Sequence, residues 1–154
     1  MRIDDIRALK TSTGRLLGVD FGDVRTGLAV SDASRYLASG LETVAPGSMS
    51  KTADAVAAAA REHRVSGIVL GLPVNMDGSQ GFRAERIRTF ADILAERVSV
   101  PIVLLDERLT TVSASRFLNE TNTRGKKRKA VIDTLSAQII LQNALDRLGH
   151  MAER

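Results

Sequence analysis

The chain has 154 residues, of which 44% are hydrophobic and 26% charged, the composition of an ordinary single globular domain. It contains no cysteine, which excludes disulfides, thiol nucleophiles, iron–sulfur clusters and cysteine-based zinc sites. With four Phe, one Tyr and no Trp, it also has too few aromatic side chains for a single-strand binder built on base stacking.

The formal net charge of +4 comes from one basic segment. Five of the six residues from 124 to 129 are Lys or Arg, and without them the net charge falls to −1. A basic balance favours nucleic acid or another anionic partner, so the position of this segment matters more than the total charge.

No run of residues approaches the ~18 apolar residues of a membrane helix, and the N-terminal residues lack the apolar core of a secretory leader. We therefore expect a cytosolic protein without a membrane partner. Residues 1–13 are polar and predict a flexible N-terminal tail, followed by a single domain over residues 14–150.

The first half of the chain predicts a β-meander followed by a helix. Apolar runs at 15–21 and 26–31, joined by a short polar connection, predict a hairpin. A weaker strand is expected at 36–44, and Ser50 is the expected N-cap of an alanine-rich helix that ends near His63.

The second half alternates strands and helices. The alternation, after three meandering strands, predicts a mixed sheet with an antiparallel part and a parallel part, flanked by helices. The expected elements are buried strands at 67–71 and 102–106, a helix at 82–97, a short helix at 110–119, a basic loop at 120–129 and an amphipathic helix at 130–148.

Carboxylates occur where these elements end or begin. Asp20 lies inside an apolar strand, Asp106 and Glu107 follow another strand, and Asp133 lies near the start of the last helix. Each has a structural explanation of its own. Asp20 can end its strand and cap the following turn, Glu107 can pair with the neighbouring Arg108, and an acidic residue in a first helical turn is favoured by the helix dipole.

The combination of these carboxylates favours a functional interpretation. Sites in open α/β sheets form at the carboxyl ends of strands, and carboxylates that gather there repel one another unless a cation neutralises them. Oxygen ligands suit Mg²⁺ or Mn²⁺. Two such ions can activate water and stabilise the leaving oxygen in phosphodiester hydrolysis.

Four segments in this order resemble the signature motifs of the YqgF/RuvX family: GVDFGDVRTGLAVSD, GLPVNMDGSQ, LLDERLTT and AVIDTLSAQIILQ. The resemblance extends from about Leu16 to Leu145. The first motif alone is also similar to a strand turn of actin-like ATPases and sugar kinases, but those proteins need two such domains, and the chain lacks a Walker loop.

The resemblance implies an RNase H-like fold, with a mixed five-stranded sheet flanked by helices, and metal-dependent cleavage of nucleic acid. The catalytic and metal-binding positions of the family fall on Asp20, Glu107 and Asp133, with Asp106 as the adjacent alternative. The implied cofactor is a pair of Mg²⁺ or Mn²⁺ ions.

Residues beside these positions are candidates for nucleic-acid contacts. An arginine beside a tight turn can hold a phosphate, and a helix N-terminus binds anions. The basic segment can supply salt-sensitive affinity for phosphates, although a solvated loop without function would look the same in the sequence. The candidates are Arg25, Thr26, Asn75, Ser79, Arg108, Arg124, Lys126, Lys127, Arg128 and Lys129.

The family resemblance leaves three hypotheses open. The first is an endonuclease that processes the 5′ end of the 16S ribosomal RNA precursor. The second is a Holliday junction resolvase, which would act on branched DNA as a homodimer. The third is a nucleic-acid-binding assembly factor without catalysis.

Overall fold

The structure, a computed structural model, describes residues 5–22, 24–72, 81–106 and 125–151, with residues 125–133 described by their backbone. Within these residues the sheet has five strands in the order β3-β2-β1-β4-β5. The strands are β1 (Leu17–Asp20), β2 (Thr26–Ser31), β3 (Ala38–Val44), β4 (Ile68–Leu72) and β5 (Ile102–Asp106).

The sheet is mixed in the way that the sequence predicts. Strand β2 pairs antiparallel with β1 and β3, whereas β1, β4 and β5 run parallel to one another. The carboxyl ends of these three parallel strands therefore lie at one edge of the sheet.

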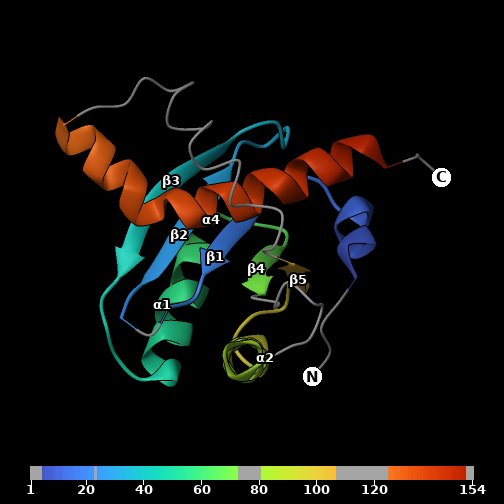
Figure 1. Ribbon diagram of the computed structural model, residues 1–154. Helices are drawn as coiled ribbons and strands as arrows, with labels where there is room; N and C mark the ends of the chain where they lie inside the picture. The colour runs from blue at the N-terminus through green and yellow to red at the C-terminus, as the bar shows by residue number, and fades with distance from the viewer. Residues whose placement is uncertain (1–4, 23, 73–80, 107–124, 152–154) are drawn as a thin grey trace.

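Helices cover both faces of the sheet (Figure 1). Helices α1 (Met49–Glu62) and α2 (Phe82–Ala95) lie on one face, and the long helix α4 (Gly125–His150) crosses the other. Successive strand residues supply the two cores, because their side chains alternate between the faces. Val19 and Leu70 pack with α1 and α2, and Val69 and Leu105 pack with α4.

Two glycines allow α4 to lie directly on the sheet. A Cβ on Gly18 of β1 would lie 2.7 Å from Leu141 Cβ and 2.9 Å from the Ala137 carbonyl oxygen. A Cβ on Gly40 of β3 would collide with the hydroxyl of Thr134. Helix α4 thus packs closely against β3 and β1 in turn.

The N-terminal residues differ from the predicted flexible tail. Ile6–Thr11 forms a 3₁₀ helix, η1, whose Leu9 is fully buried in the core beneath α4. Arg35, from the β2–β3 turn, donates hydrogen bonds to the Gly14 carbonyl oxygen at 2.7 Å and to Ser66 Oγ at 2.9 Å. The prediction is wrong over these residues because a distant arginine and a core contact hold the segment.

Two further predictions need correction. The N-cap of α1 is Ser48, whose Oγ accepts a hydrogen bond from the Lys51 backbone N–H at 3.1 Å, and not Ser50. The basic segment is not a loop over residues 125–129, because these residues form the first turns of α4. The short helix predicted at 110–119 lies outside the described residues. No helix in the described part of the chain is long and apolar enough to cross a membrane.

Candidate active site

Asp20 is the last residue of β1 and pairs with Gly27 of β2. Strand alternation places it on the same face as Gly18, the face that α4 covers. Burial raises the pKa of Asp20, and the positive charge of Arg83 on α2 lowers it by a smaller amount. The carboxylate is therefore held where its charged form is disfavoured, which indicates a site that gains a cation.

The structure does not support a capping role for Asp20. Among the described residues, no backbone N–H and no side chain donates a hydrogen bond to its carboxylate. Arg83 acts on it only through its charge. Half-buried without a hydrogen-bond partner in this part of the chain, the carboxylate is available to a ligand.

The end of β1 is fixed in place by its neighbours. Phe21 stacks on Phe90 of α2 with ring centroids 4.2 Å apart. The turn then bends so tightly that a Cβ on Gly22 would lie 2.5 Å from the Arg25 carbonyl oxygen. Only glycine fits there without displacing the backbone, so this turn presents Asp20 at a defined position.

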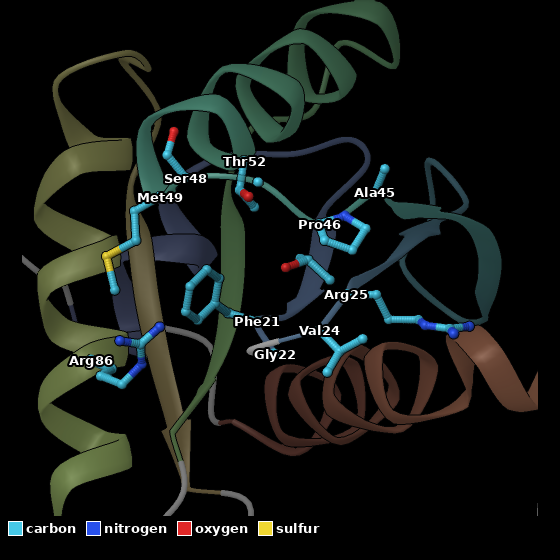
Figure 2. A pocket seen from close by; sticks show the side chains of 12 residues that line it. Phe21, Gly22, Val24, Arg25, Ala45, Pro46, Ser48, Met49, Thr52 and Arg86 are labelled. Atoms are coloured by element: carbon cyan, nitrogen blue, oxygen red, sulfur yellow. The ribbon is translucent and has the colours of Figure 1, made fainter.

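Arg25 and Thr26 follow this turn, as the motif predicts. Arg25 is exposed, and its side chain points away from Phe21 and Arg86 (Figure 2). Thr26 is buried at the start of β2. Both line a cavity of about 300 Å³ between the turn, the start of α1 and helix α2.

Asp106 ends β5 at the same edge of the sheet as Asp20. Strand β4 lies between the two strands, which places their axes roughly 10 Å apart. Asp106 also lines a second cavity together with residues of the last turns of α4. The structure thus brings Asp106 to the carboxyl edge but sets it two strands away from Asp20.

Asp133 lies in the third turn of α4, because the helix begins at Gly125. The first turn contains no acidic residue. The helix dipole acts within the first turn, so it does not account for an acidic residue at position 133. The non-functional explanation of Asp133, as a favourable first-turn residue, therefore does not hold. In the backbone, Asp133 precedes Ala137 by one helical turn, and the Ala137 carbonyl oxygen faces Gly18, two residues before Asp20.

Several predicted site residues lie outside the described part of the chain, and their roles stay predictions. The side chains of Asp133 and of the basic residues 126–129 also fall outside it. Three residues near the site were missed by sequence reasoning, namely Arg83, Arg86 and Thr52, which only the packing of α1 and α2 brings to this edge. The residues outside the described ranges are Glu107, Arg108, Asn75, Ser79 and Arg124.

Asp20 fits the role of one oxygen ligand for a divalent cation, because it is half-buried, its charge is disfavoured and it accepts no hydrogen bond from the described residues. Those residues alone do not bring three metal-ligating side chains together. A complete ligand set therefore needs contributions from positions beyond them, as the sequence motifs predict.

A family model described as RuvX, Holliday junction resolvase, matches residues 14–147. The chain belongs to the RuvX family. It is 47% identical over 147 residues to a Cereibacter sphaeroides protein named "Putative pre-16S rRNA nuclease", a match that covers 96% of the chain and 92% of the relative. A Myxococcus xanthus protein of the same name is 48% identical over 132 residues, covering 86% and 87%. RuvX membership confirms the resemblance seen in the motifs and places the chain among nucleases.

Solved structures confirm the RNase H-like fold expected of a RuvX protein. The chain is similar to Thermus thermophilus RuvC in complex with a Holliday junction substrate, with a TM-score of 0.57 and 14% identity, over 88% of the chain and 96% of RuvC. It is also similar to the human cytomegalovirus terminase nuclease domain soaked with Mn, with a TM-score of 0.57 and 13% identity, over 93% and 88%. At these identities the likeness concerns the fold.

Proposed function

We propose that this RuvX protein is a divalent-metal-dependent endonuclease that hydrolyses phosphodiester bonds in structured nucleic acid, and that it processes the 5′ end of the 16S ribosomal RNA precursor. The observation that carries the proposal is Asp20, a half-buried carboxylate with a raised pKa at the carboxyl edge of the sheet. The names of the relatives support the RNA substrate. The cytoplasm is the location that goes with this proposed substrate.

Asp20, Glu107 and Asp133 are the proposed ligands for two Mg²⁺ or Mn²⁺ ions, with Asp106 as the alternative to Glu107. Bound ions of this kind supply an activated water and charge stabilisation at the leaving oxygen. The burial that raises the pKa of Asp20 also strengthens its interaction with a cation, because the local dielectric is low.

The phosphates of the strand are bound by side chains around this edge in our proposal. Arg25 contributes from the turn after β1, and the basic residues 126–129 contribute from the first turns of α4. Asn75, Ser79, Arg108 and Arg124 keep the binding roles that the motifs predict.

Asp20→Asn tests the site. The carboxamide keeps the shape of the side chain but removes the charge that a cation requires, so cleavage dependent on Mn²⁺ should be lost while nucleic-acid binding is retained. Asp92→Asn is the matched control, because Asp92 is an exposed residue of α2. Cleavage that survives in Asp20→Asn at the rate of the control would refute the proposed centre and favour a non-catalytic assembly factor.

A Holliday junction resolvase is the second candidate, favoured by the description of the family model. The two candidates share their chemistry and differ in substrate geometry. One purified sample should be tested on a precursor rRNA 5′ leader and on a four-way DNA junction. Paired symmetric nicks in the junction require a two-fold dimer, so sedimentation as a monomer would exclude the resolvase.

A further inference from the structure

The residues that line the cavity beside the β1–β2 turn indicate a second binding site. The cavity lies between that turn, the β3–α1 connection and helix α2 (Figure 2). Its volume is about 300 Å³. Phe21, which lines it, belongs to the core under α1 and α2, whereas Asp20 faces α4. The cavity and the candidate active site therefore lie on opposite faces of the sheet at the same edge. Asp20 and Phe21, which face them, are consecutive residues where β1 ends.

Two threonines line this cavity without a hydrogen-bond partner. Thr26 is 2% exposed and Thr52 is 5% exposed. Among the residues that the structure describes, neither hydroxyl makes a hydrogen bond. Neither oxygen is fully buried, so each keeps some accessible surface at the cavity. A hydroxyl that reaches a cavity from an almost fully buried side chain can hydrogen-bond to a molecule that enters the cavity. Two such hydroxyls in one cavity point to a polar ligand.

The first turn of α1 faces the same cavity. Ser48 and Met49 line it, and the Ser48 hydroxyl accepts the hydrogen bond of the Lys51 N–H. This leaves the N–H groups of Met49 and Ser50 without an intrahelical partner. A helix N-terminus carries partial positive charge and unpaired donors, which favours an anion.

The charge of the lining agrees with that preference. Arg86 belongs to it, and so does Arg25, although the guanidinium of Arg25 points away from the cavity (Figure 2). No Asp or Glu is among the described residues that line the cavity. Two hydroxyl groups, a helix N-terminus and the guanidinium of Arg86 together suit a phosphate oxygen, since charge-assisted hydrogen bonds are the strongest that such groups make.

We propose that this cavity is a phosphate subsite that binds a backbone phosphodiester close to the scissile one. The proposal rests on the proposed nuclease function for the nature of the ligand. A strand whose scissile phosphate lies at Asp20 crosses the carboxyl edge of the sheet and places a flanking phosphate between Thr26, Thr52 and the start of α1. The small volume of the cavity suits one phosphate and its sugar.

Thr52→Val and Thr26→Val test the subsite, because valine keeps the shape and removes the hydroxyl. The dissociation constant is measured by fluorescence anisotropy without divalent cations, on a precursor rRNA leader and a four-way DNA junction. Each substitution should weaken binding about tenfold. Each should also leave the melting temperature unchanged or raise it, which a purely structural hydroxyl would not do. Thr89→Val is the matched control, an exposed threonine of α2 whose hydroxyl donates to the Glu85 carbonyl oxygen at 3.0 Å.

Strands with a single methylphosphonate locate the bound phosphate. Neutralising one phosphate within about two nucleotides of the cleaved bond should weaken binding to the wild type about tenfold and leave the affinity of Thr52→Val unchanged, because the contact is already lost. If the wild type binds nucleic acid and both valine variants bind it equally well, the subsite is refuted and the nuclease proposal stands.

Inorganic phosphate separates the two proposals. Titrated into the wild type, it should shift the backbone amide resonances of Met49 and Ser50, and the shifts should be lost in Thr52→Val. If neither nucleic acid is bound or cleaved but these shifts occur, the nuclease proposal fails and the anion site stands. If phosphate shifts the same resonances in Thr52→Val as in the wild type, the threonines are not part of an anion site.

Discussion

Gly18→Ala tests whether helix α4 positions the catalytic centre. The added Cβ would lie 2.7 Å from Leu141 Cβ and 2.9 Å from the Ala137 carbonyl oxygen. Carbon atoms in good contact are about 3.5–4.0 Å apart. Helix α4 must therefore move away from β1 by about 1 Å to make room, because the obstacles are a Cβ atom and a backbone oxygen and not the flexible end of a side chain.

The cost of this displacement follows from overpacking. Extra methyl groups in a packed core cost about 1–3 kcal/mol, and a change of 1 kcal/mol moves the melting temperature by about 2–4 °C in a domain of this size. A loss of about 2 kcal/mol should thus lower the melting temperature by roughly 4–8 °C. Since α4 carries Asp133, a shift of about 1 Å should also reduce Mn²⁺-dependent cleavage about 100-fold.

Thermal unfolding and cleavage of one substrate by the same samples measure both effects. Gly149→Ala in the same helix is the control, because a Cβ there meets nothing within 4 Å. It should keep the activity and the melting temperature of the wild type or slightly raise the latter. If the melting temperature of Gly18→Ala falls and cleavage does not, α4 does not position the catalytic groups. If neither changes, the close approach of α4 to β1 is wrong.

Three further outcomes are expected. Burial raises the pKa of Asp20, so its charge opposes folding. Without divalent cations, Asp20→Asn should melt higher than the wild type at pH 7, and the gain should vanish as the pH falls below about 4, where the wild-type carboxyl is protonated in both states. Asp32→Asn should instead melt lower than the wild type at pH 7, because the hydrogen bond from the backbone N–H of Leu37 lowers the pKa of Asp32. If both variants shift the melting temperature in the same direction, the directions assigned to the two pKa shifts are refuted. Phe90→Ala should cost about 3–5 kcal/mol in urea unfolding, because Phe90 is fully buried, and a loss near zero would contradict the stack at the end of β1. Replacing the four basic residues 126–129 by Ala should reduce the slope of log affinity against log salt, and an unchanged slope would exclude them from phosphate contacts.

The sheet was predictable because its signals are local. Gly22 lies between two apolar runs, and this pattern predicts the hairpin wherever the hairpin lies in the fold. Asp20 was predictable for the same reason, as a charged residue inside an apolar strand needs a partner or a cation. The order of strands and helices then places the carboxyl ends at one edge, which the structure confirms.

The remaining features depend on contacts that no local pattern contains. The burial of Leu9 needs the core under α4 and the hydrogen bonds that Arg35 donates across the fold. The early start of α4 was missed because the charge of residues 125–129 suggested a loop, although Lys and Arg are good helix formers. Nothing in the sequence shows that the hydroxyls of Thr26 and Thr52 face a cavity without a partner among the described residues, since that depends on what lies opposite them.

Cleavage of a phosphodiester strand needs groups that bind cations and groups that bind phosphates. In our proposals these lie on the two opposite faces of the sheet at its carboxyl edge. On the α4 side, Asp20 is a half-buried carboxylate that favours cations. On the other side, the cavity presents Arg86, threonine hydroxyls and a helix N-terminus, which favour anions. A bare acidic centre repels the strand it must cut, so affinity for phosphates has to come from nearby groups. A phosphate held in the cavity offsets that repulsion within one or two nucleotides of the cleaved bond. The cation-binding and anion-binding groups thus act on different parts of the same strand.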